Sequence, residues 1–201
     1  MNIEMPVTLK MGDLMSEEEF FQFCQMNDTL EFERDSHGNI IVMSPTGIFT
    51  GGFNSRILIE LGIWNKENQL GEVFDSSTGF TLPNGSVRSP DVSYIQEDRL
   101  NQLPKEQQEK FALIYPDFVI EIRSKSDDLK YLLDKMNEYL ETGTSLGWLI
   151  DRFDKKVYVY QPNQSVVVYD SLKIILSGEP VLPGFTLDLG AVVEKTNKSF
   201  R

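Results

Sequence analysis

The clearest pattern along the chain is a short, dense apolar run followed directly by an amphipathic segment. The run is DFVIEIRS, residues 117–124, and its density of β-branched and aromatic side chains predicts a buried strand. The segment that follows, residues 127–143, spaces its apolar side chains three and four positions apart, which predicts a helix that Gly143 ends. Those apolar side chains are Leu129, Leu132, Leu133, Met136 and Leu140.

Two further helices are expected towards the N-terminus. Ser16 and Glu19 have the spacing of a capping box and predict a short helix over residues 17–25. Helical periodicity also runs through residues 53–68. The glycine-rich stretch TGIFTGG, residues 46–52, is interpreted as a turn that leads into this second helix.

The remaining apolar stretches are short and bounded by turn residues, which is typical of strands. They lie at residues 30–34, 39–44, 72–77, 79–82, 89–95, 147–151, 156–161, 165–170 and 173–178. Residues 97–111 are polar and predicted to be helical in part, and the tail 182–189 is expected to pack on the core. This mixture of strands and helices predicts the α/β class. No repeat or break in composition divides the chain, so we expect one domain over residues 1–201, with residues 1–27 as a peripheral N-terminal segment.

Composition and charge narrow the function classes. The chain has 201 residues, 40% of them hydrophobic, and a formal net charge of −12. A charge of this sign argues against non-specific wrapping of nucleic acid, because such affinity comes from Lys and Arg neutralising phosphates. The net charge does not exclude a local basic patch on the surface of this acidic protein. A bound divalent cation would offset part of the negative charge.

Single occurrences of two residue types exclude several kinds of site. Cys24 is the only cysteine, which excludes an intrachain disulfide and a cysteine-rich zinc site. His37 is the only histidine, which excludes a multi-histidine metal centre and a standard serine triad. No apolar run approaches the roughly 20 residues that span a bilayer, and the N-terminus lacks the layout of a signal peptide. We therefore expect a cytoplasmic protein with no membrane partner.

A carboxylate in the middle of the densest apolar run is the candidate for chemistry. Side chains alternate across a strand, so Val119, Glu121 and Arg123 share one face of the predicted strand. Asp91 lies on the predicted strand 89–95. If the two strands are neighbours, Asp91 and Glu121 converge on one point and offer oxygen ligands suited to Mg²⁺. An acidic and a basic residue at this spacing also fit a surface pair or a device that protects a sheet edge.

Several motifs in this order resemble a known family. They are NQLGEVFDSSTGFTLPNGSVRSPDVSYI, YPDFVIEIRSKSDDL, KMNEYLETGTSLGWLID and VYVYQP. The chain resembles the Uma-type family of bacterial restriction-endonuclease-like proteins, a branch of the PD-(D/E)xK nuclease superfamily. The resemblance runs from about residue 30 to residue 189.

The resemblance implies a fold, a reaction and a set of site residues. The fold is a restriction-endonuclease-like mixed β-sheet flanked by α-helices. The implied reaction is hydrolysis of DNA phosphodiester bonds that depends on Mg²⁺ (or Mn²⁺). Asp91 would be the first metal ligand, Glu121 the second, and the carbonyl of Ile122 the third.

The chain departs from the superfamily pattern at two places. The superfamily lysine is replaced by Arg123, which stays protonated and cannot act as a general base, although it can hold a phosphate or a water. Lys135 and Lys125 are the two candidates for the missing lysine. Many relatives also supply an acid from the helix before the active-site strands, and here Glu60, or Glu33 on the first hairpin, could contribute.

Three hypotheses follow for function. The first is a metal-dependent DNA endonuclease with Asp91, Glu121, Arg123 and Lys135 in its active site. The second is a non-catalytic domain that keeps the nuclease fold and binds a protein or nucleic-acid partner. The third is hydrolysis of a small phosphorylated ligand. A homodimer is expected, because enzymes of the restriction type commonly cut two strands with two sites.

Overall fold

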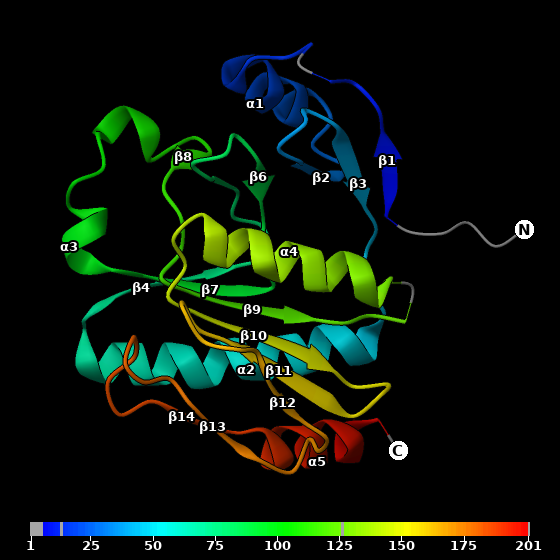
Figure 1. The fold of residues 1–201 in the computed structure, drawn as a ribbon, viewed down its shortest axis with the longest axis vertical. Helices are drawn as coiled ribbons and strands as arrows, with labels where there is room; N and C mark the ends of the chain where they lie inside the picture. Colours follow the sequence, from blue (N-terminus) through cyan, green and yellow to red (C-terminus); the bar gives the residue numbers. More distant parts are fainter. Residues whose placement is uncertain (1–5, 13, 126, 201) are drawn as a thin grey trace, which may run out of the picture.

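The computed structural model describes residues 6–12, 14–125 and 127–200, and Figure 1 shows its arrangement. The helices are α1 (Glu17–Met26), α2 (Ile48–Asn68), α3 (Glu97–Leu100), a 3₁₀ helix (Lys105–Gln107), α4 (Leu129–Glu141) and α5 (Leu189–Ser199). The strands are β1 (Val7–Leu9), β2 (Glu31–Arg34), β3 (Ile40–Met43), β4 (Gly71–Asp75), β5 (Phe80–Thr81), β6 (Val87–Arg88), β7 (Val92–Gln96), β8 (Ala112–Leu113), β9 (Phe118–Ile122), β10 (Leu146–Asp151), β11 (Lys156–Tyr160), β12 (Val167–Tyr169), β13 (Ile175–Ser177) and β14 (Thr186–Asp188).

The strands form two six-stranded sheets and one two-stranded ribbon. The central sheet has the order β12-β11-β10-β9-β7-β4, and the second sheet has the order β1-β3-β2-β6-β5-β8. Within the central sheet β9 runs parallel to β10 and antiparallel to β7, so the sheet is mixed. This arrangement confirms the predicted α/β class and the mixed sheet flanked by helices.

Helices cover both faces of the central sheet, with α2 and α5 on one side and α4 on the other (Figure 1). Strand β9 shows how the sequence fills both interiors. Phe118, Ile120 and Ile122 belong to the core cluster on the α2 side, whereas Val119 belongs to the cluster on the α4 side. The alternation expected from the sequence is therefore confirmed, and it sends residue 121 towards α4.

Local signals set the ends of the two helices predicted with the clearest boundaries. Ser16 and Glu19 form the capping box of α1. Asp128 caps α4, because its side chain accepts a hydrogen bond from the backbone N–H of Tyr131 at 2.8 Å. Gly143 follows α4 with φ +120°, and a Cβ there would lie 2.5 Å from the ring of Tyr115. Only glycine fits both requirements at this turn.

Several boundaries differ from the expectation. Helix α2 begins at Ile48, so the stretch interpreted as a turn forms its first turns. The glycines there leave room for a neighbour, because the ring of Phe200 lies 3.2 Å from where a Cβ of Gly52 would be. Helix α5 was not predicted at all. Its Leu189 and Val192 join the core cluster on the α2 side, so tertiary packing stabilises it.

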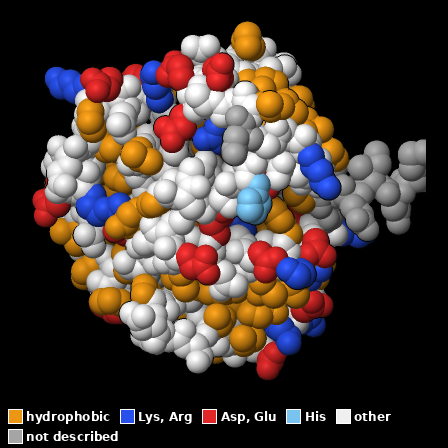
Figure 2. All heavy atoms as spheres, turned by 45° about the horizontal axis from the view of Figure 1, so that its top comes forward, with side chains coloured by type: hydrophobic (Ala, Val, Ile, Leu, Met, Phe, Trp, Pro, Cys, Tyr) orange, Lys and Arg blue, Asp and Glu red, His pale blue; other side chains and the backbone are white. Residues whose placement is uncertain are grey.

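Charge is mixed over the surface. Figure 2 shows one face, where Asp and Glu side chains are interspersed with Lys and Arg side chains and with apolar ones. Among the helices described, none is both long enough and apolar enough to cross a membrane.

Candidate active site

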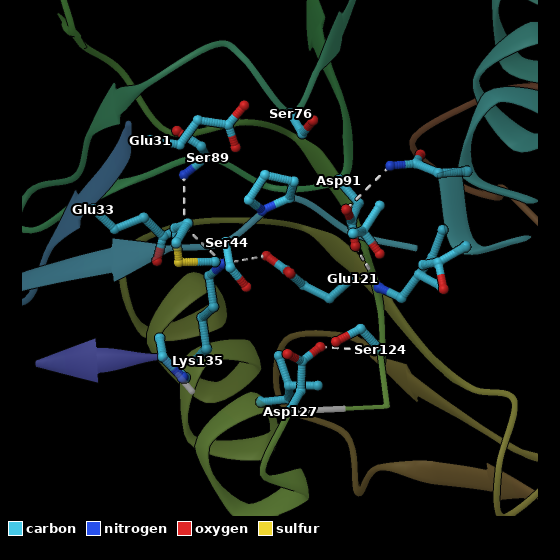
Figure 3. A pocket seen from close by; sticks show the side chains of 18 of the residues that line it. Glu31, Glu33, Ser44, Ser76, Ser89, Asp91, Glu121, Ser124, Asp127 and Lys135 are labelled. Atoms are coloured by element: carbon cyan, nitrogen blue, oxygen red, sulfur yellow. Dashed lines mark hydrogen bonds and ion pairs between the residues drawn. The ribbon is translucent and has the colours of Figure 1, made fainter. Parts of the chain in front are cut away.

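Glu121 lies on β9, and Asp91 directly precedes the neighbouring strand β7. Strands β7 and β9 pair with Val92 opposite Ile120, and one further step in this register places Asp91 opposite Glu121. The backbone N–H of Ile122 donates a hydrogen bond of 2.7 Å to Oδ2 of Asp91. Both carboxylates line one pocket of about 210 Å³ (Figure 3). The convergence expected from the sequence is therefore present.

Lys135 supplies the cation of this pocket. It rises from α4 and points between two carboxylates (Figure 3). Its Nζ lies 2.8 Å from Oε1 of Glu33 and 2.8 Å from Oε1 of Glu121, and only 2% of its side chain is exposed. Burial alone would lower the pKa of Lys135, but Glu121 and Glu33 together raise that pKa well above its ordinary value. The ammonium therefore stays protonated at neutral pH.

Glu33 reaches the same site from β2. It is fully buried, and besides Lys135 it accepts hydrogen bonds from Arg88 at 3.1 Å and from the backbone N–H of Ser89 at 2.9 Å. Burial raises the pKa of Glu33, but Lys135 and Arg88 reverse this effect and hold the pKa below its usual value. Arg88 also pairs with Glu138 at 2.5 Å, which fixes its guanidinium behind the pocket.

The negative charge of Glu121 is compensated by fewer neighbouring donors and cations than that of Glu33. Its Oε1 accepts hydrogen bonds from Lys135 and, at 3.0 Å, from the hydroxyl of Tyr139. Burial raises the pKa of Glu121, Lys135 lowers it, and the charge of Glu33 raises it again, with a net upward shift. No residue within the described parts of the chain donates a hydrogen bond to Oε2 of Glu121.

Asn54 of α2 completes the other side of the pocket. Its Nδ2 donates to Oδ1 of Asp91 at 3.1 Å, while its Oδ1 is buried and has no hydrogen-bond partner. Burial raises the pKa of Asp91 to about 7, the charge of Glu121 adds to that shift, and the N–H of Ile122 opposes it. The site thus combines a buried amide oxygen without a hydrogen-bond partner and a carboxyl group that is only partly ionised at neutral pH.

Arg123 does not lie beside Glu121 as the sequence suggested. Strand β9 ends at Ile122, so the alternation that would have placed Arg123 on the face of Glu121 stops there. Its Nη1 instead pairs with Asp151 at 2.7 Å and with Asp154 at 3.0 Å. Arg123 therefore joins the ends of β9 and β10 by ion pairs, and the catalytic role assigned to it stays a prediction.

Two other candidates lie away from the carboxylate pair. Lys125 is exposed and lines an adjacent cleft with Pro45 and Thr46. Glu60 pairs with Lys195 at 3.8 Å on the outer side of α2. Of the two lysines proposed from the sequence, Lys135 is the one that contacts Glu121. Of the two additional acids, Glu33 is the one in the site.

Three residues of the site were not foreseen. Asn54 was missed because α2 was expected to begin only one residue before it. Tyr139 follows Lys135 by four positions, so the helix period could have placed the two side chains on one face. Arg88 lies on a two-residue strand, and nothing local in the sequence marks it as a partner of Glu33.

The set of oxygen atoms fits a hard divalent cation. The site offers Asp91, the free Oε2 of Glu121 and the unpaired Oδ1 of Asn54, and such oxygens are the ligands that Mg²⁺ prefers. The described residues contain no group of three His, Cys, Asp or Glu side chains that could hold a metal, so the amide and a backbone carbonyl would have to complete the set. Five carboxylates and one lysine line the described pocket: Glu31, Glu33, Asp91, Glu121 and Asp127, with Lys135. A phosphate needs added positive charge to enter such a pocket.

Comparisons with known proteins agree with this fold. A family model named Uma2, described as "Putative restriction endonuclease", matches residues 17–190. A crystal structure from Anabaena variabilis, described as "a putative nuclease belonging to DUF820", is similar with a TM-score of 0.73 and 20% sequence identity. The similarity covers 90% of this chain and 99% of that chain, and at this identity it concerns the fold alone. Among curated proteins, none matches the chain.

Proposed function

Because the chain belongs to the Uma2 family of putative restriction endonucleases, we propose that it is a metal-dependent endonuclease that hydrolyses DNA phosphodiester bonds. The observation that carries the proposal is the pairing of Asp91 with Glu121 across β7 and β9, at a pocket into which Lys135 points. Two carboxylates and a buried cation at one opening can serve hydrolysis of a phosphodiester.

The proposed metal is Mg²⁺ or Mn²⁺, held by Asp91, Glu121 and the carbonyl of Ile122. The uncompensated Oδ1 of Asn54 adds a fourth oxygen. When bound, such an ion lowers the pKa of a bound water and offsets charge on the phosphoryl oxygens. The raised pKa of Asp91 supports the assignment, because a carboxyl that ionises reluctantly gains most from a neighbouring dication.

The chain's own side chains divide the remaining work. Lys135 stays protonated, so it orients Glu121 and offers positive charge to the phosphate, and it does not act as the general base. An ammonium has three N–H donors, and the two carboxylates of Glu33 and Glu121 take two of them. We propose that the third donor binds a phosphate oxygen.

The test is cleavage of supercoiled plasmid and of short single-stranded DNA with Mg²⁺ or Mn²⁺. Wild type is compared with Asp91→Asn and Glu121→Gln, which keep the shapes of the side chains. Glu60→Gln is the control, because this carboxylate lies outside the pocket on the same molecule. We expect both site variants to lose activity and the control to keep it. Activity that survives in the site variants, or that is absent from all proteins, contradicts the proposal.

A non-catalytic role as a binding domain is the second candidate. It is favoured by the closed ion pairs of Lys135, which satisfy Glu33 and Glu121 without any metal. Titration calorimetry separates the two functions. Heat of Mn²⁺ binding that disappears in Asp91→Asn supports the nuclease, whereas a folded protein without such heat supports the binding domain. Turnover of a small phosphodiester, but not of DNA, would support hydrolysis of a small ligand.

We also propose that the protein forms a homodimer. Strand β12 ends the central sheet, and its residues Val167–Tyr169 are all exposed and uncharged. An edge of this kind pairs readily with another strand, and self-pairing obeys the twofold symmetry of most dimers. Sedimentation at micromolar concentration should give a dimer that Val168→Lys converts to a monomer. A wild-type monomer would contradict the proposal.

A further inference from the structure

A second cleft of about 480 Å³ lies between the first turns of α2 and the chain that follows β10. Its lining includes Phe49, Phe53, Arg152, Lys155, Lys173 and Asp170, and it is named the Arg152 cleft below. Arg152 is the residue directly after β10, whose neighbour β9 runs parallel and ends at the same edge of the sheet. The carboxylate site and the Arg152 cleft therefore both lie at the end of the central sheet where β9 and β10 finish.

The guanidinium of Arg152 is held firmly, and among the described residues it forms no ion pair; the nearest compensating charge is that of the adjacent Asp151, which pairs with Arg123. Its central carbon lies 4.9 Å from the ring centroid of Phe49, 5.5 Å from that of Phe53 and 5.3 Å from that of Phe153. Its Nη2 donates a hydrogen bond of 2.6 Å to Oγ1 of Thr50. Its Nε is buried without a hydrogen-bond partner, and no carboxylate of the described residues forms an ion pair with this side chain. Aromatic faces hold the cation in place without a carboxylate bound to it.

The Arg152 cleft is basic, in contrast to the carboxylate pocket. Lys155 and Lys173 are exposed at its rim. The one carboxylate among the described lining residues is Asp170, which already pairs with Lys156 at 3.5 Å. Three cations thus gather beside one compensated acid, on a chain whose net charge is −12. This is the local basic patch that the overall charge had left open.

Thr50 connects the Arg152 cleft to the carboxylate pocket. Its side chain accepts the hydrogen bond from Arg152, and the same residue lines the pocket that contains Asp91 and Glu121. A polymer whose phosphate enters the carboxylate pocket can thus continue past the start of α2 to the guanidinium. The positive charge of Arg152 attracts a phosphate, and the two exposed lysines suit further phosphates along an extended strand.

We propose that the Arg152 cleft binds backbone phosphates of the substrate strand, next to the phosphate that occupies the carboxylate pocket. This inference rests on the proposed nucleic-acid substrate. Arg152, Lys155 and Lys173 contribute to the affinity for the strand, whereas the acidic pocket carries out the hydrolysis. Because the basic cleft is separate from the acidic pocket, a protein with a net negative charge can bind a polyanion at this end of the sheet.

The experiment measures fluorescence anisotropy of a labelled 16-nucleotide single strand in EDTA, over a series of salt concentrations. Lys155→Gln/Lys173→Gln is compared with Lys66→Gln/Lys105→Gln, which removes the same charge from exposed lysines elsewhere. We expect the cleft variant to bind about tenfold more weakly and to lose about 1.4 from the slope of log K against log salt, at roughly 0.7 per phosphate contact. Arg152→Lys should also weaken binding, because it keeps the charge but loses the hydrogen bond to Thr50 and the planar contacts with the aromatic rings that hold the cation in the cleft.

The outcomes separate this inference from the proposed function. Weaker binding by the cleft variant, with the control unchanged, supports the cleft even if no cleavage is ever observed. Equal weakening in both double variants overturns it, as does wild type that binds no oligonucleotide. Competition by inorganic phosphate as effective as that by the oligonucleotide, phosphate for phosphate, would show a site for a single anion and also overturn it. Where cleavage occurs, the cleft variant should raise KM and leave kcat unchanged, and an unchanged KM would reject the cleft while the nuclease stands.

Discussion

Replacing Lys135 by methionine tests whether the buried cation holds the site together. The ammonium lies 2.8 Å from Glu33 and 2.8 Å from Glu121, and each carboxylate is almost fully buried. At an effective dielectric constant of about 20, each contact represents roughly 6 kcal/mol of attraction. Most of this is offset by the cost of removing three charges from water. Breaking such a buried cluster from one side costs about 3–5 kcal/mol of unfolding free energy.

The pH dependence of the loss identifies its cause. The cation contributes fully at pH 8, because the pKa of Lys135 is raised and the ammonium is protonated in both the folded and the unfolded chain. In Lys135→Met the pKa of Glu121, already raised by burial, rises further because its main compensation is gone. Protonation at lower pH then relieves the uncompensated charge. The destabilisation should therefore shrink from pH 8 to pH 5, by up to about 1.4 kcal/mol per pH unit below that pKa.

Urea unfolding followed by circular dichroism at the two pH values measures the effect. Lys130→Met is the control, since Lys130 lies on the same helix and its ion pair with Asp134 is exposed. We expect no measurable change in the control. A loss below about 1 kcal/mol in Lys135→Met at pH 8, or a larger loss that is the same at pH 5, would refute the reasoning from the buried ion pairs.

Three further predictions concern single positions. Without metal, wild type should lose about 3 kcal/mol relative to Asp91→Asn between pH 4 and pH 7, because a carboxyl with a pKa raised to about 7 destabilises the fold by about 1.4 kcal/mol for each pH unit over which it ionises only in the unfolded chain; thermal unfolding of both proteins across that range measures the difference. Arg123→Met should lower the unfolding free energy by about 1–3 kcal/mol, since the buried Asp151 loses its cation, while Mn²⁺ heats in calorimetry stay unchanged; a loss of those heats would place Arg123 in the metal site. Ser16→Ala removes the cap of α1 and should lower the unfolding free energy by about 1 kcal/mol in urea, with the carboxylate pocket unaffected; an unchanged unfolding free energy would mean that the cap does not contribute to the stability of the fold.

The sequence predicted β9 and α4 well because their signals are local. A strand buried on both faces needs a run of apolar residues, and a helix that covers it needs an apolar stripe. Both requirements are visible within a dozen residues. The pairing of Asp91 with Glu121 could be anticipated as well, because adjacent strands and side-chain alternation leave few arrangements for two acids.

The start of α2 shows how a local signal can mislead. Gly47, Gly51 and Gly52 resemble a turn, since glycine weakens a helix by about 1 kcal/mol relative to alanine. In the fold Gly47 is the N-cap of α2, and the helix continues through Gly51 and Gly52, where the ring of Phe200 packs at 3.2 Å from the Cβ position of Gly52. That contact joins residues almost 150 positions apart. Because a turn was expected up to residue 52, Asn54 was not considered as a site residue, although its amide contacts Asp91.

The contact between Glu33 and Lys135 could not be predicted from the residues of the chain, although both were candidates. They are separated by about a hundred residues and belong to different layers, yet their charged atoms are 2.8 Å apart. Considered alone, a glutamate on a hairpin strand and a lysine on a helix flank are typical surface residues. Only the packing of α4 against the central sheet, with the second sheet beyond it, turns both into buried groups.

The position of the cation follows from the face of the sheet that carries Glu121. Strand β9 directs Val119 and Glu121 towards α4, so a partner for Glu121 must come from that helix or from the strand itself. Arg123, two residues after Glu121, cannot be this partner, because β9 ends at Ile122 and the guanidinium of Arg123 pairs with Asp151. Lys135 is buried beside Met136, which packs in the core cluster between α4 and the central sheet. The alkyl chain of Lys135 therefore runs towards the sheet, and its ammonium reaches Glu121. Lys135 of α4 thus supplies the positive charge at Glu121, while Arg123 at the end of the strand joins β9 to β10.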